Sequence, residues 1–389
     1  MSAERTGVSL VRRTMLGLQP SRSGWQIAGM SAVAVVIVGA LSTLLISSTG
    51  SSPTAALHAL YTGSIASQAA WTTTLLYAAP LLIVAAGSCI SSRSGAFNIG
   101  QEGQVLIGAL AVAAVTLKLQ LAGWALLVIG ICVAALAGGF WAWLSSLMYR
   151  ISGVNIVVST LLMTFVAQQL ISYAVNTSWF LQEPSVAGIA PLPESKQIAT
   201  GSQLRSFGSY PNLQLSVGLI LALALTVAVA VTMTRTRWGF RLKMVGLNPL
   251  TARHAGVRVA ALGGLALAIS GAFAGIAGAV LLTSPVGNFR LQPGVSSNIG
   301  WDGLLVALVA RNRPIVAVPF ALLFGILRSG GNFLSSTGVP PFLVDVVKGL
   351  LVLAFVAPPA LADILKRRAA TRRASASGRH APALQGAAA

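Results

Sequence analysis

Long apolar segments dominate this chain, and they constrain its fold more than any other feature. A helix needs roughly 20 mostly apolar residues to cross the hydrocarbon core of a bilayer. Only 8% of the 389 residues are charged, too few for a soluble domain of this size. We therefore predict an all-α, polytopic membrane helix bundle of about ten spans. These spans are residues 27–46, 68–91, 101–117, 122–148, 154–175, 213–234, 260–283, 301–310, 314–330 and 341–362.

The distribution of Lys and Arg predicts how the chain is oriented, because these residues are retained mainly on the cytoplasmic side. If both termini are cytoplasmic, most of the 26 basic residues fall on inner segments. This model predicts a transmembrane domain at residues 27–362 between two basic tails, residues 1–26 and 363–389. We expect the apolar run after Trp25 to remain as the first span rather than to be a cleaved signal peptide. The formal charge of +19 is spread over loops and tails, which favours contact with membrane lipid over nucleic-acid binding.

A short phrase occurs twice, 200 residues apart. NIGQEG at residues 98–103 recurs as NIGWDG at residues 298–303. In the predicted topology the first copy opens a helix directed outward and the second opens one directed inward, as expected for an inverted-topology repeat with broken helices. The helix at residues 301–310 rises only about 15 Å, so we expect the second copy near the middle of the bilayer. The depth of the first copy is left open.

Each copy places a carboxylate, Glu102 or Asp302, at a helix start, where a negative charge is favoured. One interpretation is that each acid caps its own helix, with Asn98 and Gln101 forming a capping box. The other is that they line a pathway for a neutral, hydroxyl-rich or heterocyclic solute, because ionisable groups inside spans usually face a cavity. On the second interpretation the substrate-pathway residues are Asn98, Gln101, Glu102, Asn155, Ser159, Asn298, Trp301 and Asp302.

Two of these residues, Asn155 and Ser159, are four positions apart and therefore lie on the same face of the predicted helix. Gln168 and Gln169 follow deeper in the same span. Such groups also commonly bridge helices, so this alternative stays open. In the last span, Asp345 and Lys348 are three residues apart and are predicted to form a structural ion pair.

Two loops are informative. In the inner loop, residues 235–258, Asn248 can cap a helix, Pro249 suits its first position and Gly256 suits its exit, which predicts a short helix over Pro249–Ala255. It either passes force to a soluble partner or lies on lipid. The residues predicted to pass this force are Gly246, Asn248, Pro249, Ala252, Arg253 and Gly256. The outer loop, residues 176–212, is either a connector or folds over the outer face.

Several kinds of chemistry find no support in the sequence. Cys89 and Cys132 lie in different spans, so neither a disulfide nor a metal site is expected. No lysine follows a glycine, so the GxxxxGK[ST] phosphate-binding loop is absent and any ATP hydrolysis must be carried out by another chain. A secondary transporter that uses Glu102 and Asp302 for ion coupling is an alternative. A membrane enzyme is the least favoured, since the acidic residues and histidines show no catalytic or metal-ligand spacing.

Four phrases, FNIGQEGQVLIGA, VGLNPLTARHAGV, IGWDGLLVALVARN and GVPPFLVDVVKGLLVL, resemble the permease subunits of ABC importers for nucleosides and simple sugars, within the branched-chain amino acid and ribose permease family. The likeness runs from about residue 70 to 362. It implies a bacterial plasma-membrane protein without a cofactor or an enzymatic activity of its own. It also implies the following partners: cytoplasmic ABC ATPase subunits, a second and non-identical permease, and a solute-binding protein received by outer loops near residues 176–212 and 284–297.

Overall fold

The computed structural model describes residues 22–48, 50, 52–184, 191–209, 212–334 and 342–358. The chain divides into two compact units, residues 51–344 and residues 1–50 with 345–389. The second unit contains α2 (Arg22–Ser48), which begins inside the segment predicted to be the N-terminal tail, and the helical residues 345–358. The rest of that tail, residues 1–21, and the predicted C-terminal tail at 363–389 lie outside the described residues.

The unit of residues 51–344 is built from helices, most of which are joined by short connections, with longer loops after α7 and α11. Within the described residues, each predicted span overlaps a helix, and two further helices, α3 and α9, were not predicted. The elements are α3 (Pro53–Ser64), α4 (Gln68–Arg93), α5 (Gln101–Lys118), α6 (Gly123–Ser152), α7 (Ile156–Asn176), η1 (Thr200–Ser202), β1 (Ser206–Phe207), β2 (Leu215–Ser216), α8 (Val217–Arg235), α9 (Arg237–Leu247), α10 (Pro249–His254), α11 (Val259–Leu282), η2 (Pro285–Gly287), α12 (Ile299–Val309) and α13 (Pro314–Leu334).

Six of the helices in the described ranges are long and apolar enough to cross a membrane: α4, α6, α7, α8, α11 and residues Pro314–Gly331 of α13. Helix α12 is apolar but shorter than a span. The chain is therefore a multi-pass, helical membrane protein, as predicted, and the count of ten spans stays a prediction.

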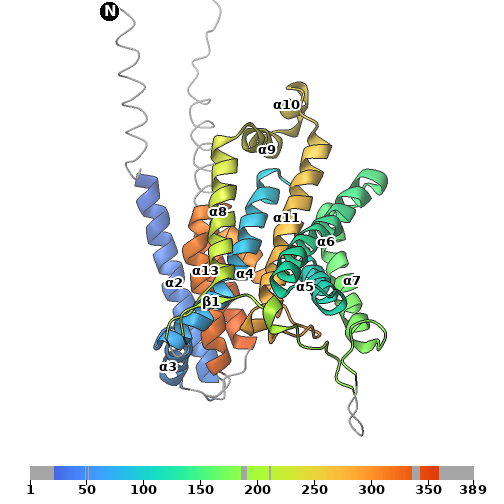
Figure 1. The fold of residues 1–389 in the computed structure, drawn as a ribbon. Coiled ribbons are helices and arrows are strands. Elements are labelled where there is room, and N and C mark those ends of the chain that lie inside the picture. The colour runs from blue at the N-terminus through green and yellow to red at the C-terminus, as the bar shows by residue number, and fades with distance from the viewer. Residues whose placement is uncertain are drawn as a thin grey trace, which may run out of the picture. The chain divides into compact units, whose positions relative to one another are not determined.

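Helix α11 packs against α4, α5 and α6, and glycines allow the close approach (Figure 1). A β-carbon on Gly275 would overlap the backbone of Ala134 in α6, and one on Gly278 would overlap the backbone of Val105 in α5. Gly271 faces the backbone of Gly138 in the same way. Small residues are common at such contacts because van der Waals packing between backbones drives helix association in lipid.

We expect Gly275→Ala to lower the thermal stability of the purified protein, because overpacking a tight contact costs about 1–3 kcal/mol or more. Gly263→Ala on the same helix is the matched control, since nothing lies within 4 Å of the added methyl. The control should be neutral or stabilising by about 1 kcal/mol, as alanine is the better helix former. Equal melting temperatures for the two variants would show that the Gly275 contact is not tight.

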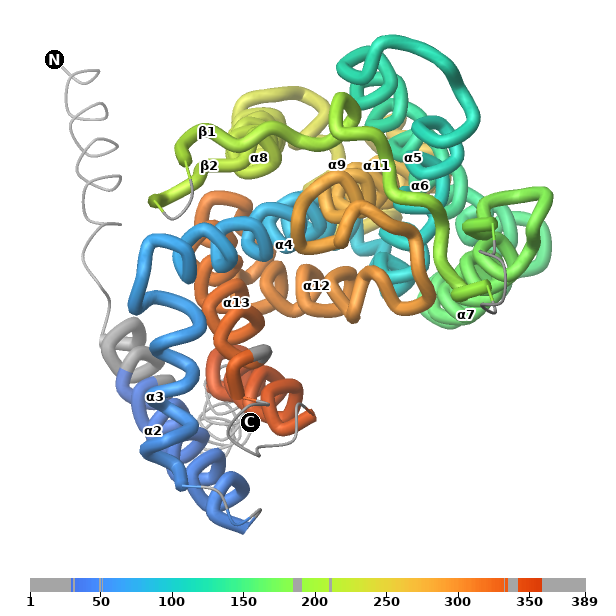
Figure 2. The backbone as a smooth tube through the Cα atoms, turned by 60° about the horizontal axis from the view of Figure 1, so that its bottom comes forward, coloured from blue at the N-terminus to red at the C-terminus, as the bar shows by residue number. Residues whose placement is uncertain are grey.

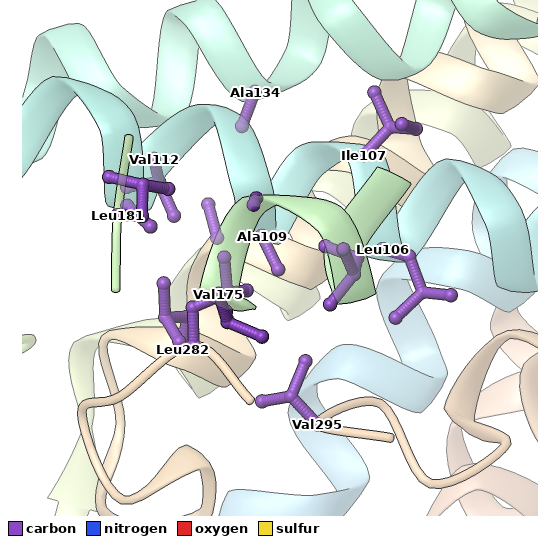
Figure 3. Packing of buried hydrophobic residues seen from close by; sticks show 14 of the residues in the cluster. Leu106, Ile107, Ala109, Val112, Ala134, Val175, Leu181, Leu282 and Val295 are labelled. Carbon is purple, nitrogen blue, oxygen red and sulfur yellow. The ribbon is translucent and has the colours of Figure 1, made fainter. Parts of the chain in front are cut away.

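One apolar cluster joins the ends of α5, α7 and α11 to the outer loops (Figure 3). Val112 of α5, Val175 of α7 and Leu282 of α11 meet Leu181 and Val295 from the loops that follow α7 and α11. All five side chains are buried. The cluster therefore anchors both loops to the helices beneath them.

The described part of the outer loop is also tied to the segment that follows α11. Figure 2 shows residues 191–209 running from the end of α7 to the β1–β2 hairpin beside α8. Arg290 pairs with Glu183 and, at 3.1 Å, with Glu194. The amide of Ser195 donates to the carbonyl of Leu291 at 2.9 Å. The described residues of this loop are thus held against the segment that follows α11.

Candidate functional site

The two copies of the repeated phrase contact each other through Glu102, in the first turn of α5. The amide of Gly300 donates to Oε2 of Glu102 at 2.7 Å, and the amide of Asn298 donates to Oε1 at 3.3 Å. The hydroxyl of Ser296 donates to the same carboxylate. Glu102 is 2% exposed. Its carboxylate therefore satisfies free N–H groups at the start of α12, the helix of the other copy.

The glycines of both phrases are positions of close approach. A β-carbon on Gly300 would overlap the backbone of Glu102, and one on Gly100 would overlap the carbonyl of Thr160 in α7. A β-carbon on Gly103 would lie 2.7 Å from Cα of Thr164, and one on Gly303 would lie 2.5 Å from Cβ of Val84. The glycine spacing of the phrase is therefore explained by packing of each helix start against its neighbours.

The second acid, Asp302, is paired with a cation from α13. Nη1 of Arg328 lies 2.9 Å from Oδ2 of Asp302, and both side chains are largely buried. Arg328 also donates to the carbonyls of Ser296 and Ser297, and its guanidinium lies 5.4 Å from the ring centroid of Tyr77. We call Glu102, Ser296, Asn298, Gly300, Asp302 and Arg328 the repeat junction.

Arg328 stabilises a strained turn within this junction. Ser297 and Asn298 have φ values of 43° and 72°, a left-handed conformation that costs roughly 1–2 kcal/mol for most residues. The two carbonyls that accept from Arg328 lie in or next to this turn. No role for Arg328 was predicted from the sequence, although a charged residue in an apolar span is a signal of a functional or structural site.

Replacing Arg328 with glutamine should leave the buried carboxylate of Asp302 without its cation, which costs about 3–5 kcal/mol. We expect a large fall in thermal stability, and partial recovery in the Arg328→Gln/Asp302→Asn double variant. Arg290→Gln is the control, because its ion pairs are partly exposed and such pairs contribute about 1 kcal/mol or less. A double variant no more stable than Arg328→Gln would contradict this account.

The polar residues that precede Glu102 form a separate buried cluster. Nδ2 of Asn98 donates to Gln104 at 2.8 Å and to Ser270 of α11 at 3.1 Å. Nε2 of Gln101 donates to Ser88 of α4 at 2.6 Å and to Ser270 at 3.2 Å. This polar cluster links α4, α5 and α11.

The predicted capping box of Asn98 and Gln101 is wrong. The residue before α5 is Gly100, and no side chain caps this helix start. The physical reason is that Asn98 and Gln104 bond each other reciprocally through their amides, at 2.8 and 2.9 Å. This buried pairing satisfies two side chains together, where a local cap would leave Gln104 without its partner.

The remaining predicted pathway residues lie elsewhere in their helices. Asn155 is exposed and caps α7 by accepting from the amide of Val157 at 2.8 Å. Ser159 is buried and donates to the carbonyl of Ile156 at 3.1 Å. Trp301 is half-buried in the first turn of α12. The structure thus brings Glu102, Asn298 and Asp302 together in the junction, but places Asn155 and Ser159 in local contacts of α7.

A cavity of about 210 Å³ lies beside the junction. Glu102, Gln168, Ser297 and Asn298 contribute polar groups to its lining. Its other lining residues are Leu106, Ile171, Pro293, Gly294 and Ser296. A space lined by amide and hydroxyl groups together with apolar side chains suits a neutral polar solute.

The predicted helix of the inner loop is confirmed as α10. Oδ1 of Asn248 accepts from the amides of Leu250 and Thr251 at 3.0 and 3.1 Å, and Pro249 occupies the first turn. Ala252 is buried, whereas Arg253 is exposed. Gly256 has a φ of +78°, as a helix exit requires.

Gly246, at the end of α9, connects this inner loop to the segment that leads to the first phrase. A β-carbon there would overlap the carbonyl of Arg93 and lie 3.3 Å from the amide of Gly95. Glu102 follows Gly95 by seven residues. The inner loop therefore packs against the segment Arg93–Gly95, which precedes the first phrase.

In the unit of residues 1–50 and 345–389, the predicted pair of Asp345 and Lys348 is present. Nζ of Lys348 lies 2.6 Å from Oδ1 of Asp345, and the side chains are 5% and 60% exposed respectively. The structural role assigned to this pair stays a prediction.

Comparison with known proteins identifies relatives along most of the chain. Residues 70–356 match the family described as "Branched-chain amino acid transport system / permease component". The glucose ABC transporter permease protein TsgB13 of Haloferax volcanii is 30% identical over 87% of this chain and 90% of its own length. The guanosine ABC transporter permease protein NupP of Bacillus subtilis is 29% identical, over 84% and 91%. The nucleoside ABC transporter permease protein NupB of Lactococcus lactis is 25% identical, over 88% and 94%.

Proposed function

Because this chain belongs to the family of permease components of branched-chain amino acid transport systems, we propose that it forms the membrane pathway of an ABC importer for a nucleoside or a related simple sugar. It is a transport subunit and not an enzyme. Support for the substrate class comes from the relatives, which are described as permeases for glucose, nucleosides and guanosine. The cavity beside the repeat junction supports the same class, since its polar lining carries amides and hydroxyls.

The repeat junction is the observation that carries the proposed mechanism. Glu102 of one helix start holds the backbone of the other, and Arg328 holds the turn before it. A movement that separates α5 from α12 must break the hydrogen bonds that Glu102 accepts from Ser296, Asn298 and Gly300, and would open the cavity beside them. We therefore assign alternation between closed and open states of the pathway to this contact. The roles of Asn98 and Gln101 in this scheme are to hold α5 against α4 and α11.

The contacts also support an inverted repeat. Lys118, at the end of α5, donates to the carbonyl of Trp179 in the outer loop, so α5 runs from the junction toward that loop. Helix α12 begins after the segment tied to the outer loop and ends just before Arg311 and Arg313. Gly303 packs against Val84, near the middle of α4, in agreement with a central position for the second copy. Both termini and α10 are then cytoplasmic, and the chain spans the bilayer about ten times.

The proposed partners follow from this arrangement. ATPase subunits would bind α9 and α10, while a solute-binding protein would bind the loops joined by Arg290. A second permease would complete the pathway. The four residues Asn248, Pro249, Ala252 and Gly256 shape α10, and Gly246 passes its movement to Arg93.

Reconstitution into vesicles tests the proposal. The chain together with its ATPase, second permease and binding protein should take up a radiolabelled nucleoside or glucose only when ATP is supplied. The chain alone should show no uptake when a proton or sodium gradient is applied. Uptake driven by an ion gradient without the ATPase would replace the importer with a secondary carrier.

Gly256→Trp should disconnect ATP hydrolysis from uptake, because tryptophan adds bulk at the exit of α10 and strains a residue with positive φ. ATP hydrolysis should persist while uptake falls at least about tenfold, equivalent to about 1.4 kcal/mol of lost coupling. Gly256→Ala is the control, because alanine introduces the strain of a positive φ without the bulk of tryptophan. Coupled transport by the tryptophan variant would remove this loop from the mechanism.

A further inference from the structure

A groove runs along one face of α11 at the end that follows α10. It consists of two cavities of about 330 and 320 Å³. The first contains Arg241, Arg258, Leu262 and Leu265 in its lining. The second is lined by Thr232, by Trp238 and by six apolar residues: Ile90, Ala228, Val229, Met233, Ile269 and Phe273. The first cavity is thus the basic end of the groove, and the second is its apolar end.

The residues of α11 that line the two cavities follow one another along the helix. Residues 258, 262, 265, 269 and 273 are spaced four, three, four and four apart, so they share one face of α11. Trp238 and Arg241 share a face of α9 in the same way. Figure 1 shows α9 passing between the ends of α8 and α11, above α4. Leu262, Ile269 and Phe273 are partly exposed, so neighbouring helices leave this face incompletely covered.

The basic end of the groove favours an anion. An adjoining cavity of about 550 Å³ shares Gly256, Val257 and Arg258 with it and adds Arg150 and Arg253. The sequence contains no acidic residue between Glu194 and Asp302. Among the described residues, no ion pair involves Arg241 or Arg258. A negatively charged group would therefore meet several arginines and no carboxylate from these loops.

The apolar end lies too deep for a soluble partner. Phe273 follows Arg258 by 15 residues of helix, which corresponds to about 22 Å along α11. An occupant that fills both ends needs an anionic head and a long apolar tail. We propose that the groove binds an anionic glycerophospholipid, with its phosphate against Arg241 and Arg258 and one acyl chain along Leu265 and Ile269 to Phe273. Trp238 lies where the head meets the chain, a position that tryptophan favours in membranes.

The test uses the full chain purified in neutral detergent. Phosphatidylglycerol and phosphatidylcholine with identical chains, each carrying a photoreactive group at the acyl end, are the probes. Phosphatidylglycerol should label peptides that contain residues 265–273 or 228–238. Arg241→Gln/Arg258→Gln should weaken its binding about 30-fold, because each basic residue near an anionic lipid raises the affinity about fivefold. Lys243→Gln is the matched control, since Lys243 is an exposed cation of α9 that lines neither cavity.

A second variant tests the apolar end without changing charge. Ala228→Trp fills that cavity and should displace the acyl chain, while thermal unfolding shows whether the variant is folded. Equal binding of the two lipids, or equal effects of Lys243→Gln and the arginine pair, would overturn the proposal. So would labelling confined to other helices, or loss of labelling when the ATPase subunits are bound, since a protein partner would then occupy the groove.

Discussion

Glu102→Gln is expected to reduce uptake by the complete importer by about 10- to 100-fold, because hydrogen bonds to a charged group contribute about 1.5–3 kcal/mol. Glutamine has nearly the same shape, but it carries no charge and replaces one accepting oxygen with an NH₂ group. That group would face N–H or O–H donors of Ser296, Asn298 or Gly300. The measurement is initial uptake of a radiolabelled nucleoside or glucose, normalised to the amount of protein in the membrane.

Asp345→Asn is the control for Glu102→Gln. It also removes one negative charge from a predicted span, but its side chain is 60% exposed. Uptake by this variant should stay within about twofold, because Asp345 makes none of the hydrogen bonds of the repeat junction. If Glu102→Gln transports normally while it is properly inserted, the carboxylate serves only to hold α12 in place and the proposed role of the junction fails.

Gly300→Ala is the second large expected effect, although it adds a single methyl group. That methyl would overlap the backbone of Glu102, and neither backbone can move without separating the two helix starts. Overpacking of this kind costs about 1–3 kcal/mol and sometimes more. We expect a lower melting temperature and a loss of uptake greater than that of Glu102→Gln, because all three hydrogen bonds to the carboxylate are displaced.

The control for Gly300→Ala is Gly263→Ala, at a position where nothing lies within 4 Å. Melting temperatures of the purified variants and uptake per inserted molecule are the two measurements. A Gly300→Ala protein with normal stability and normal uptake would show that α5 and α12 are not held in contact during transport.

The positions of the helices followed from local patterns. Apolar runs marked every predicted span, including the short one at residues 301–310, and Asn248, Pro249 and Gly256 marked the short helix α10. Such features depend on neighbouring residues, so a single sequence contains them. Helix α9 was missed because its basic residues interrupt the apolar pattern, although Thr236 caps it by accepting from the amide of Gly239 at 3.1 Å.

The partners of the site residues depended on packing instead. From the sequence, Asn98 and Gln101 fit a capping box, and Glu102 fitted the start of its own helix. In the fold, Asn98 reaches Ser270 and Glu102 reaches Gly300, contacts between residues more than 150 positions apart. Arg328 and Asp302 meet because α12 and α13 are packed together.

The sequence by itself determined that this chain is a helical membrane protein with a repeated glycine-acid phrase and a capped inner helix. Only the tertiary structure decided that the two phrases bind each other and that Arg328 supports their contact. The reason is physical: a helix is favoured by residues three and four positions apart, whereas a buried carboxylate is satisfied by whichever donors the packed helices bring to it.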